Sequence, residues 1–110
     1  MEIIETKQDD FLIFKLIGRL DSKTSPDFEK KIFDAIEEGS NNMIVDFEEL
    51  DYISSAGLRV VLKATKNLKR SEGCFVLCSM KDYVKEVFEI SGFDTFLPIV
   101  SSMEEALNQS

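Results

Sequence analysis

Residues 43–62 read MIVDFEELDYISSAGLRVVL, and this stretch determines how the rest of the chain is interpreted. The apolar run Met43–Phe47 predicts a buried strand, and the acidic residues after it predict a loop. Ser54 and Ser55 then stand at the start of a predicted helix over about 56–69, because apolar residues recur there at helical spacing. The stretch therefore predicts a strand, a loop and a helix in succession, a unit typical of α/β domains.

The N-terminal third predicts a hairpin followed by a helix. Ile3–Thr6 is a weak strand candidate, whereas Phe11–Ile17 is apolar on both faces apart from Lys15 and predicts a strong strand. The polar residues between them predict a turn, so the two strands should pair antiparallel. Ser25 predicts a helix N-cap, Pro26 suits the first turn, and Gly39 predicts the end of that helix.

The C-terminal third continues the alternation of strands and helices. Cys74–Cys78 predicts a strand, and Phe96–Val100 predicts a short last strand. Between them, three residues are expected to face inward from a helix: Val84, Val87 and Phe88. Ser102–Glu105 has the spacing of a capping box, so it predicts the start of a terminal helix.

Together these elements predict an α/β fold, in one domain over residues 1–110. Its mixed sheet should hold about four to five strands, with an antiparallel hairpin first and largely parallel strands afterwards. About four helices should pack on that sheet. No internal repeat, low-complexity tract or linker interrupts the sequence.

The charge of the chain argues against several classes of partner. It carries 21 acidic and 13 basic residues and no histidine, for a net charge of −8. Such a balance repels nucleic-acid phosphates and anionic lipid surfaces, so direct binding to nucleic acid or membrane is not expected. The longest apolar-rich run, Phe11–Ile17, contains Lys15 and is too short to span a bilayer. With no secretory signal at its start, the sequence predicts a soluble cytoplasmic protein.

Two cysteines, Cys74 and Cys78, fall four residues apart in one predicted strand. Side chains at this spacing share a face of the sheet, but they stand too far apart along the strand to form a disulfide. Both are therefore expected to be reduced core residues, as thiols usually are in the cytosol.

The serines at the start of the predicted helix are suited to carry phosphate. A helix N-terminus presents unpaired N–H groups and a partial positive charge, which stabilise a phosphate. Ala56 and Gly57 are small, so they are expected to leave the serine hydroxyls uncovered and to let another molecule approach closely. Serine is also a preferred N-cap, so Ser54 or Ser55 has that simpler structural use as well. The two uses are compatible, and the residues alone leave both open.

Three spaced motifs resemble those of bacterial anti-sigma factor antagonists of the STAS type. Ile53–Leu58, after a strand ending Val45–Phe47, is similar to the family run Asp-Ser-(Ser/Thr/Ala)-Gly-Leu, in which the first serine is phosphorylated. Gly18–Asp21 resembles the family's Gly-(Glu/Arg)-(Leu/Ile)-Asp step, and Ser91–Phe93 resembles its Ser-Gly-Leu element. Where the family has an acidic residue before the phosphoserine, this chain has Ser54. The resemblance covers nearly the whole sequence.

The resemblance implies a partner-switching cycle and not an enzyme. The unphosphorylated protein would bind an anti-sigma factor that is itself a serine kinase, and so release the sigma factor. Phosphorylation, at Ser55 by alignment on the Gly-Leu pair and at Ser54 as second choice, would break that complex until a phosphatase resets it. ATP and Mg²⁺ would belong to the partners, so the chain needs no cofactor or metal, and it should be a monomer when free. The implied partner-binding residues are Asp21, Ser54, Ser55, Ala56, Gly57, Leu58 and Arg59.

Charged residues surround the predicted site. The loop before the serines is expected to carry four carboxylates: Asp46, Glu48, Glu49 and Asp51. A phosphate there would add to a negative surface and repel an acidic partner. Four basic residues fall on one flank of the helix: Arg59, Lys63, Lys66 and Arg70. That flank is either a docking surface for an acidic partner, with Arg59 within reach of a phosphate on Ser55, or a solvated basic face.

Two other functions stay open. The first is a STAS module in a different signalling assembly or beside a transporter, which would share the fold but bind a scaffold or a transporter. The second is a small enzyme or nucleotide-binding protein with its ligand at the strand ends. Asp21, Asp46 and Asp51 are carboxylates for a metal there, although acidic residues at strand ends are more often solvated. Without histidine, a Gly-x-Ser-x-Gly turn or a Walker-type loop, hydrolase or nucleotide chemistry has little support.

Overall fold

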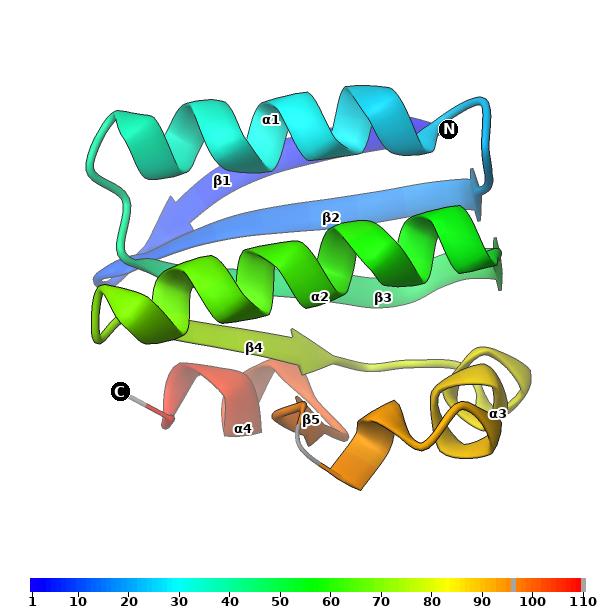
Figure 1. Cartoon of the computed structure of the whole chain (residues 1–110). Coiled ribbons are helices and arrows are strands. Elements are labelled where there is room, and N and C mark those ends of the chain that lie inside the picture. The colour runs from blue at the N-terminus through cyan, green and yellow to red at the C-terminus, as the bar shows by residue number, and fades with distance from the viewer. Residues whose placement is uncertain (96, 110) are drawn as a thin grey trace.

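Five strands form one mixed sheet, with helices packed on both of its faces (Figure 1). The computed structural model describes residues 1–95 and 97–109. The elements run in the order β1 (Glu2–Gln8), β2 (Phe11–Leu20), α1 (Ser25–Glu37), β3 (Asn42–Ile53), α2 (Ser55–Arg70), β4 (Cys74–Cys78), α3 (Asp82–Ile90), η1 (Phe93–Thr95), β5 (Ile99–Val100) and α4 (Met103–Leu107). In this described part of the chain, no helix is both long enough and apolar enough to cross a membrane.

The sheet has the strand order β1-β2-β3-β4-β5. The hairpin of β1 and β2 is antiparallel, and the three later pairings are parallel, which confirms the predicted mixed sheet. The turn of the hairpin falls at Asp9 and Asp10, inside the polar segment where the sequence predicts it. The predicted last strand over residues 96–100 is confirmed at Ile99–Val100, and residue 96 lies outside the described residues.

Alternation along the strands divides the core between the two faces of the sheet. On one face, Phe14 of β2 and Phe47 of β3 are fully buried in a cluster that includes residues of α1, α2 and α3. On the opposite face, Phe11 and Ile44 pack in a smaller cluster with Ala106 of α4. Burying an aromatic or large aliphatic side chain stabilises the fold by roughly 1.5–3 kcal/mol. The face covered by α1, α2 and α3 holds the larger cluster, so it contributes most to stability.

Strand β3 continues through the acidic residues for which the sequence predicts a loop. Its pairing with β2 shifts register twice, once after Lys15 and once after Gly18. Each shift inserts an extra residue into β3, so the buried residues become spaced by three, at Phe47, Leu50 and Ile53. The loop prediction is wrong because two β-bulges replace the alternating pattern by which a strand is recognised.

Helix α1 begins where predicted, but with a different cap. Its N-cap is Thr24, and Ser25 is the first helical residue. Ser25 is buried, and both its hydroxyl and its N–H donate to the Asp21 carbonyl, at 2.6 and 2.9 Å. The cap prediction is therefore wrong, because the Ser25 side chain closes the turn after β2 instead. Pro26 in the first turn and Gly39 beyond the last turn are confirmed.

The other predicted helices are confirmed. Helix α2 extends the predicted 56–69 by one residue at each end. In α3, Val84 and Phe88 are buried and Val87 is half-buried, so the predicted inward face is correct. The Glu105 N–H donates to the Ser102 hydroxyl at 3.1 Å, which is the expected cap of α4.

Neither cysteine of β4 takes part in a disulfide. Cys78 is buried and Cys74 is half-buried, and both belong to the cluster beneath α4. Burial raises the pKa of the Cys78 thiol to about 11. Because the thiolate is the reactive form, this thiol should be nearly inert at neutral pH.

We therefore expect native protein treated with iodoacetamide at about pH 8 to gain at most one carbamidomethyl group, on Cys74. Protein unfolded in urea should gain a group on each cysteine, because unfolding returns the pKa of Cys78 to its ordinary range. Intact-mass analysis over time, with Cys78→Ala as the control, measures both. Modification of Cys78 at equal rates with and without urea would contradict its burial.

Candidate functional site

The ends of β2 and β3 meet the start of α2 at one edge of the sheet, on the right in Figure 1. Leu20, the last residue of β2, pairs with Ile53, the last residue of β3. The Leu20 carbonyl also accepts a hydrogen bond from the Ser54 N–H at 2.9 Å. Ser54 is the N-cap of α2 and Ser55 is its first residue. The fold thus brings the Gly18–Asp21 motif next to the serine motif.

The two serines differ in exposure. Ser55 is exposed at the first position of α2. The Ser54 Oγ is buried, and it has no hydrogen-bond partner within the described residues. Ser54 therefore caps α2 through its backbone alone, since its carbonyl accepts from the Leu58 N–H at 3.0 Å and its side chain caps nothing. A buried unpaired hydroxyl costs about 1–3 kcal/mol. Of the two serines, Ser55 is therefore the one with an exposed side chain.

Gly57 and Leu58 are buried and hold α2 against the sheet. A Cβ added at Gly57 would lie 2.8 Å from the Leu20 Cγ and 2.9 Å from the Ile53 Cγ1, which is closer than carbon atoms pack. The glycine therefore lets the helix backbone approach the ends of β2 and β3. The expectation that Gly57 leaves room for another molecule is wrong, because this residue faces the core. Ala56 beside it is half-buried.

Asp21 lies in a tight turn between β2 and α1. Its Oδ1 accepts hydrogen bonds from the backbone N–H of Lys23 at 3.0 Å and of Thr24 at 3.2 Å. These donors, Lys23 first, hold the pKa of the Asp21 carboxyl below its usual value. The Thr24 hydroxyl closes the turn by donating to the Arg19 carbonyl at 2.8 Å. The turn thus presents the negative charge of Asp21 at neutral pH, directly after Leu20, whose carbonyl accepts the Ser54 hydrogen bond.

Helix α3 reaches the same edge through side-chain contacts with Asp51. The Asp51 carboxylate accepts hydrogen bonds from the Lys81 ammonium and, at 3.4 Å, from the Tyr83 hydroxyl. The Lys81 hydrogen bond holds the pKa of Asp51 below its usual value. The Arg19 guanidinium lies 4.1 Å from the centroid of the Tyr52 ring, in a cation–π contact. Tyr52 and Tyr83 are 40% and 54% exposed, so two aromatic rings border the edge.

No pattern in the sequence predicts that Lys81 and Tyr83 lie at this edge of the sheet. Each lies about 30 positions along the chain from Asp51. They arrive there because α3 packs over β3, with the Phe47 and Phe88 ring centroids 6.1 Å apart. Long-range packing of this kind, and not the local sequence, brings the start of α3 beside the end of β3.

The family model of the STAS domain matches residues 2–106 of the chain. The chain belongs to the STAS domain family. This match confirms the resemblance carried by the three sequence motifs, and it spans every strand of the sheet. The mixed five-stranded sheet with its helices is the fold of the solved structures to which this STAS domain is similar.

Relatives of this STAS domain are named as anti-sigma factor antagonists. BtrV of Bordetella bronchiseptica, named as a candidate anti-sigma factor antagonist, is 42% identical over 106 residues, which cover 96% of this chain and 91% of BtrV. The anti-sigma-B factor antagonist of Staphylococcus aureus is 26% identical over 94% of this chain and 96% of its own length. SpoIIAA of Bacillus, solved in its unphosphorylated form, has a TM-score of 0.84 at 25% identity, over 98% of this chain and 95% of SpoIIAA. A structure of phosphorylated SpoIIAA has the same fold, with a TM-score of 0.77.

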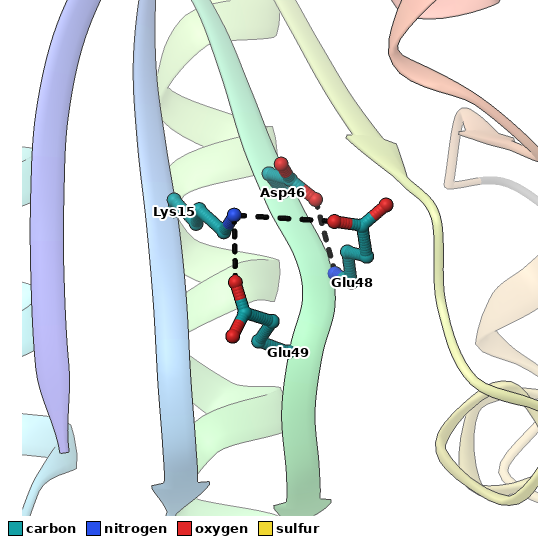
Figure 2. A network of polar contacts seen from close by, with 4 residues as sticks. All are labelled: Lys15, Asp46, Glu48 and Glu49. Atoms are coloured by element: carbon teal, nitrogen blue, oxygen red, sulfur yellow. Dashed lines mark hydrogen bonds and ion pairs between the residues drawn. The ribbon is translucent and has the colours of Figure 1, made fainter.

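The acidic run of the STAS domain lies along β3 and not in a loop before the serines. Figure 2 shows the Lys15 ammonium between two carboxylates, 2.7 Å from Glu49 and 3.9 Å from Glu48. The hydrogen bond with Glu49, and then the nearby charges, raise the pKa of Lys15. Asp46 precedes Ile53 by seven residues of strand, a distance of roughly 20 Å. The expectation that this run forms the approach to the serines is therefore wrong for Asp46, and the lysine offsets part of the negative charge.

The three aspartates considered as metal ligands are engaged separately. The Asp21 carboxylate accepts backbone hydrogen bonds, Asp46 accepts one from the Glu48 N–H at 3.0 Å, and Asp51 pairs with Lys81. Within the described part of the STAS domain, no group of three or more aspartate, glutamate, cysteine or histidine side chains is close enough to hold a metal ion.

Proposed function

We propose that this chain is an anti-sigma factor antagonist controlled by phosphorylation of Ser55. The observation that carries the proposal is the exposed Ser55 side chain at the first position of α2, beside a Ser54 hydroxyl that is buried. A kinase must reach the hydroxyl that it phosphorylates, so the exposure favours Ser55 over Ser54. The names of BtrV and of the Staphylococcus aureus relative support the same function.

The start of α2 is a favourable place for a phosphate. The first backbone N–H groups of a helix lack partners within the helix, and their partial positive charge stabilises an anion. Arg59 is exposed four residues after Ser55, and side chains at this spacing are neighbours on a helix surface. Phosphorylation would therefore leave α2 folded and change only the surface that it presents.

The partner is an anti-sigma factor that is also a serine kinase. In the transfer, the Ser55 Oγ forms a bond to the γ-phosphorus of ATP while the bond to the ADP oxygen breaks, and the hydroxyl proton passes to a base of the kinase. A phosphatase hydrolyses the phosphoserine and restores the free hydroxyl. ATP and Mg²⁺ are bound by the partner, so this chain acts by binding and not by catalysis. We place the cycle in the cytoplasm, with the free chain as a monomer.

Incubation with the cognate anti-sigma factor and ATP tests the proposal. Intact-mass analysis should find one added phosphate on the wild type and on Ser54→Ala, and none on Ser55→Ala. Ser54→Ala is the matched control, because it removes a neighbouring hydroxyl that has no hydrogen-bond partner within the described residues. Loss of the phosphate in Ser54→Ala alone would move the site to Ser54. An unmodified wild type, with the kinase active on another substrate, would overturn the proposed function.

A further inference from the structure

Helix α2 concentrates the positive charge of an acidic protein. Its 16 residues hold five of the 13 basic residues of the chain and none of its 21 acidic ones. The rest of the chain therefore holds eight basic and 21 acidic residues. A cationic helix on a chain with a net charge of −8 creates a local field opposite in sign to that of the rest of the molecule.

The basic flank of α2 borders a groove against α1. The groove has a volume of about 370 Å³, and its lining residues are Glu29, Phe33, Lys63, Lys66, Asn67 and Arg70. Lys63 is paired with Glu29 at 2.8 Å. Lys66 and Arg70 are exposed and form no ion pair with any described residue. The groove thus combines one half-buried aromatic ring with two cations whose charge is not offset by a neighbour.

This groove lies within reach of a partner bound at Ser55. At a rise of about 1.5 Å per residue, Lys66 is roughly 16 Å and Arg70 roughly 22 Å along the helix from Ser55. A typical interface covers about 800 Å² on each protein, which is roughly 30 Å across. One partner can therefore cover the start of α2 and the groove together.

We propose that the groove between α1 and α2 docks an acidic surface of the anti-sigma factor, with an apolar side chain seated against Phe33. This inference rests on the proposed function, because it assigns the same partner a second contact. Lys66 and Arg70, which form no ion pair with a described residue, can pair with a few carboxylates on a protein surface. A continuous polyanion such as a nucleic acid would extend beyond the groove and be repelled by the acidic residues in the rest of the chain. Lys66 and Arg70 lie farther from Ser55 than the screening length of about 8–10 Å, so their charge steers the partner in both phosphorylation states.

The association and dissociation rates of the cognate anti-sigma factor test this assignment. The test variant is Lys66→Glu with Arg70→Glu, and the control is Lys7→Glu with Lys31→Glu, which changes the net charge equally at exposed positions on β1 and on α1 outside the groove. We expect the association rate of the test variant to fall about tenfold at low ionic strength. The difference should shrink as salt is added, and the control should stay within about threefold of the wild type. Circular dichroism and thermal unfolding verify that both variants are folded.

Each other result overturns the assignment. If the wild type binds and the two variants associate equally fast, the groove is not a docking surface and the proposed function stands. If the wild type does not bind the anti-sigma factor, the proposed function fails and this inference fails with it. If sedimentation velocity finds a wild-type dimer that the test variant alone loses, the acidic surface belongs to a second copy of the chain.

Discussion

Phosphorylation of Ser55 is expected to lower the affinity for the cognate anti-sigma factor by about 100-fold or more. A phosphoserine adds about −1.5 to −2 charges at neutral pH, at a position that is exposed and bordered by the packed ends of β2 and β3. Unfavourable charge at an interface costs several kcal/mol, and about 1.4 kcal/mol is tenfold in affinity. The change needs no refolding, because Ser55 is at the start of a helix that tolerates an anion.

Calorimetric or optical titration of the anti-sigma factor with phosphorylated and unphosphorylated protein measures this effect. Ser55→Glu should weaken binding less than the phosphate does, because it carries a single negative charge. Ser55→Ala should bind as the unphosphorylated wild type does. Thr6→Glu adds the same single negative charge as Ser55→Glu, but at an exposed position on β1. It should leave the affinity within about twofold, because a charge outside the interface does not cost the several kcal/mol of a like charge inside it. A phosphorylated protein that binds within threefold of the unphosphorylated one would remove phosphorylation as the switch.

Gly57→Ala is expected to reduce the free energy of unfolding by about 1–3 kcal/mol, although alanine is the better helix former by about 1 kcal/mol. The added methyl group would meet the fully buried Leu20 side chain at its Cγ, 2.8 Å away, and Ile53 on the other side. Both side chains are buried in the main core cluster, so a shift of either one disturbs its packed neighbours. Relief requires α2 to move away from β2 and β3, which also shifts Ser55.

Thermal and urea unfolding measure this cost, and a loss of 1 kcal/mol corresponds to a fall of about 4–8 °C in Tm for a domain of this size. Asn67→Ala in the same helix is the control, because its exposed side chain makes the change a gain in helix propensity of under about 1 kcal/mol. Equal or higher stability of Gly57→Ala would mean that the helix does not depend on the close approach at this position. Weaker binding of the anti-sigma factor by this variant would link the helix position to the site.

Local sequence patterns determine most elements of this protein. The strand at Phe11–Ile17 is apolar apart from Lys15, helix α2 has apolar residues at helical spacing, and Ser102 is the N-cap of α4. Each pattern depends on residues within a few positions of one another, so it is readable without knowledge of the rest of the chain. The serine motif is readable for the same reason, and so are the other two motifs on which the resemblance to the family rests.

Long-range packing decides the remaining features. The bulges of β3 arise from its pairing with β2, and they convert an acidic segment without strand periodicity into a strand buried at Leu50 and Ile53. At the end of that pairing the Ser54 N–H bonds the Leu20 carbonyl and the Ser54 hydroxyl is buried, whereas Ser55 is exposed, although the two serines are adjacent in sequence and chemically identical. Gly57 acquires its function from Leu20, which is far from it along the chain. Burial is a property of what surrounds a side chain, and in this fold part of those surroundings comes from residues 30 or more positions away, as Leu20 does for Gly57.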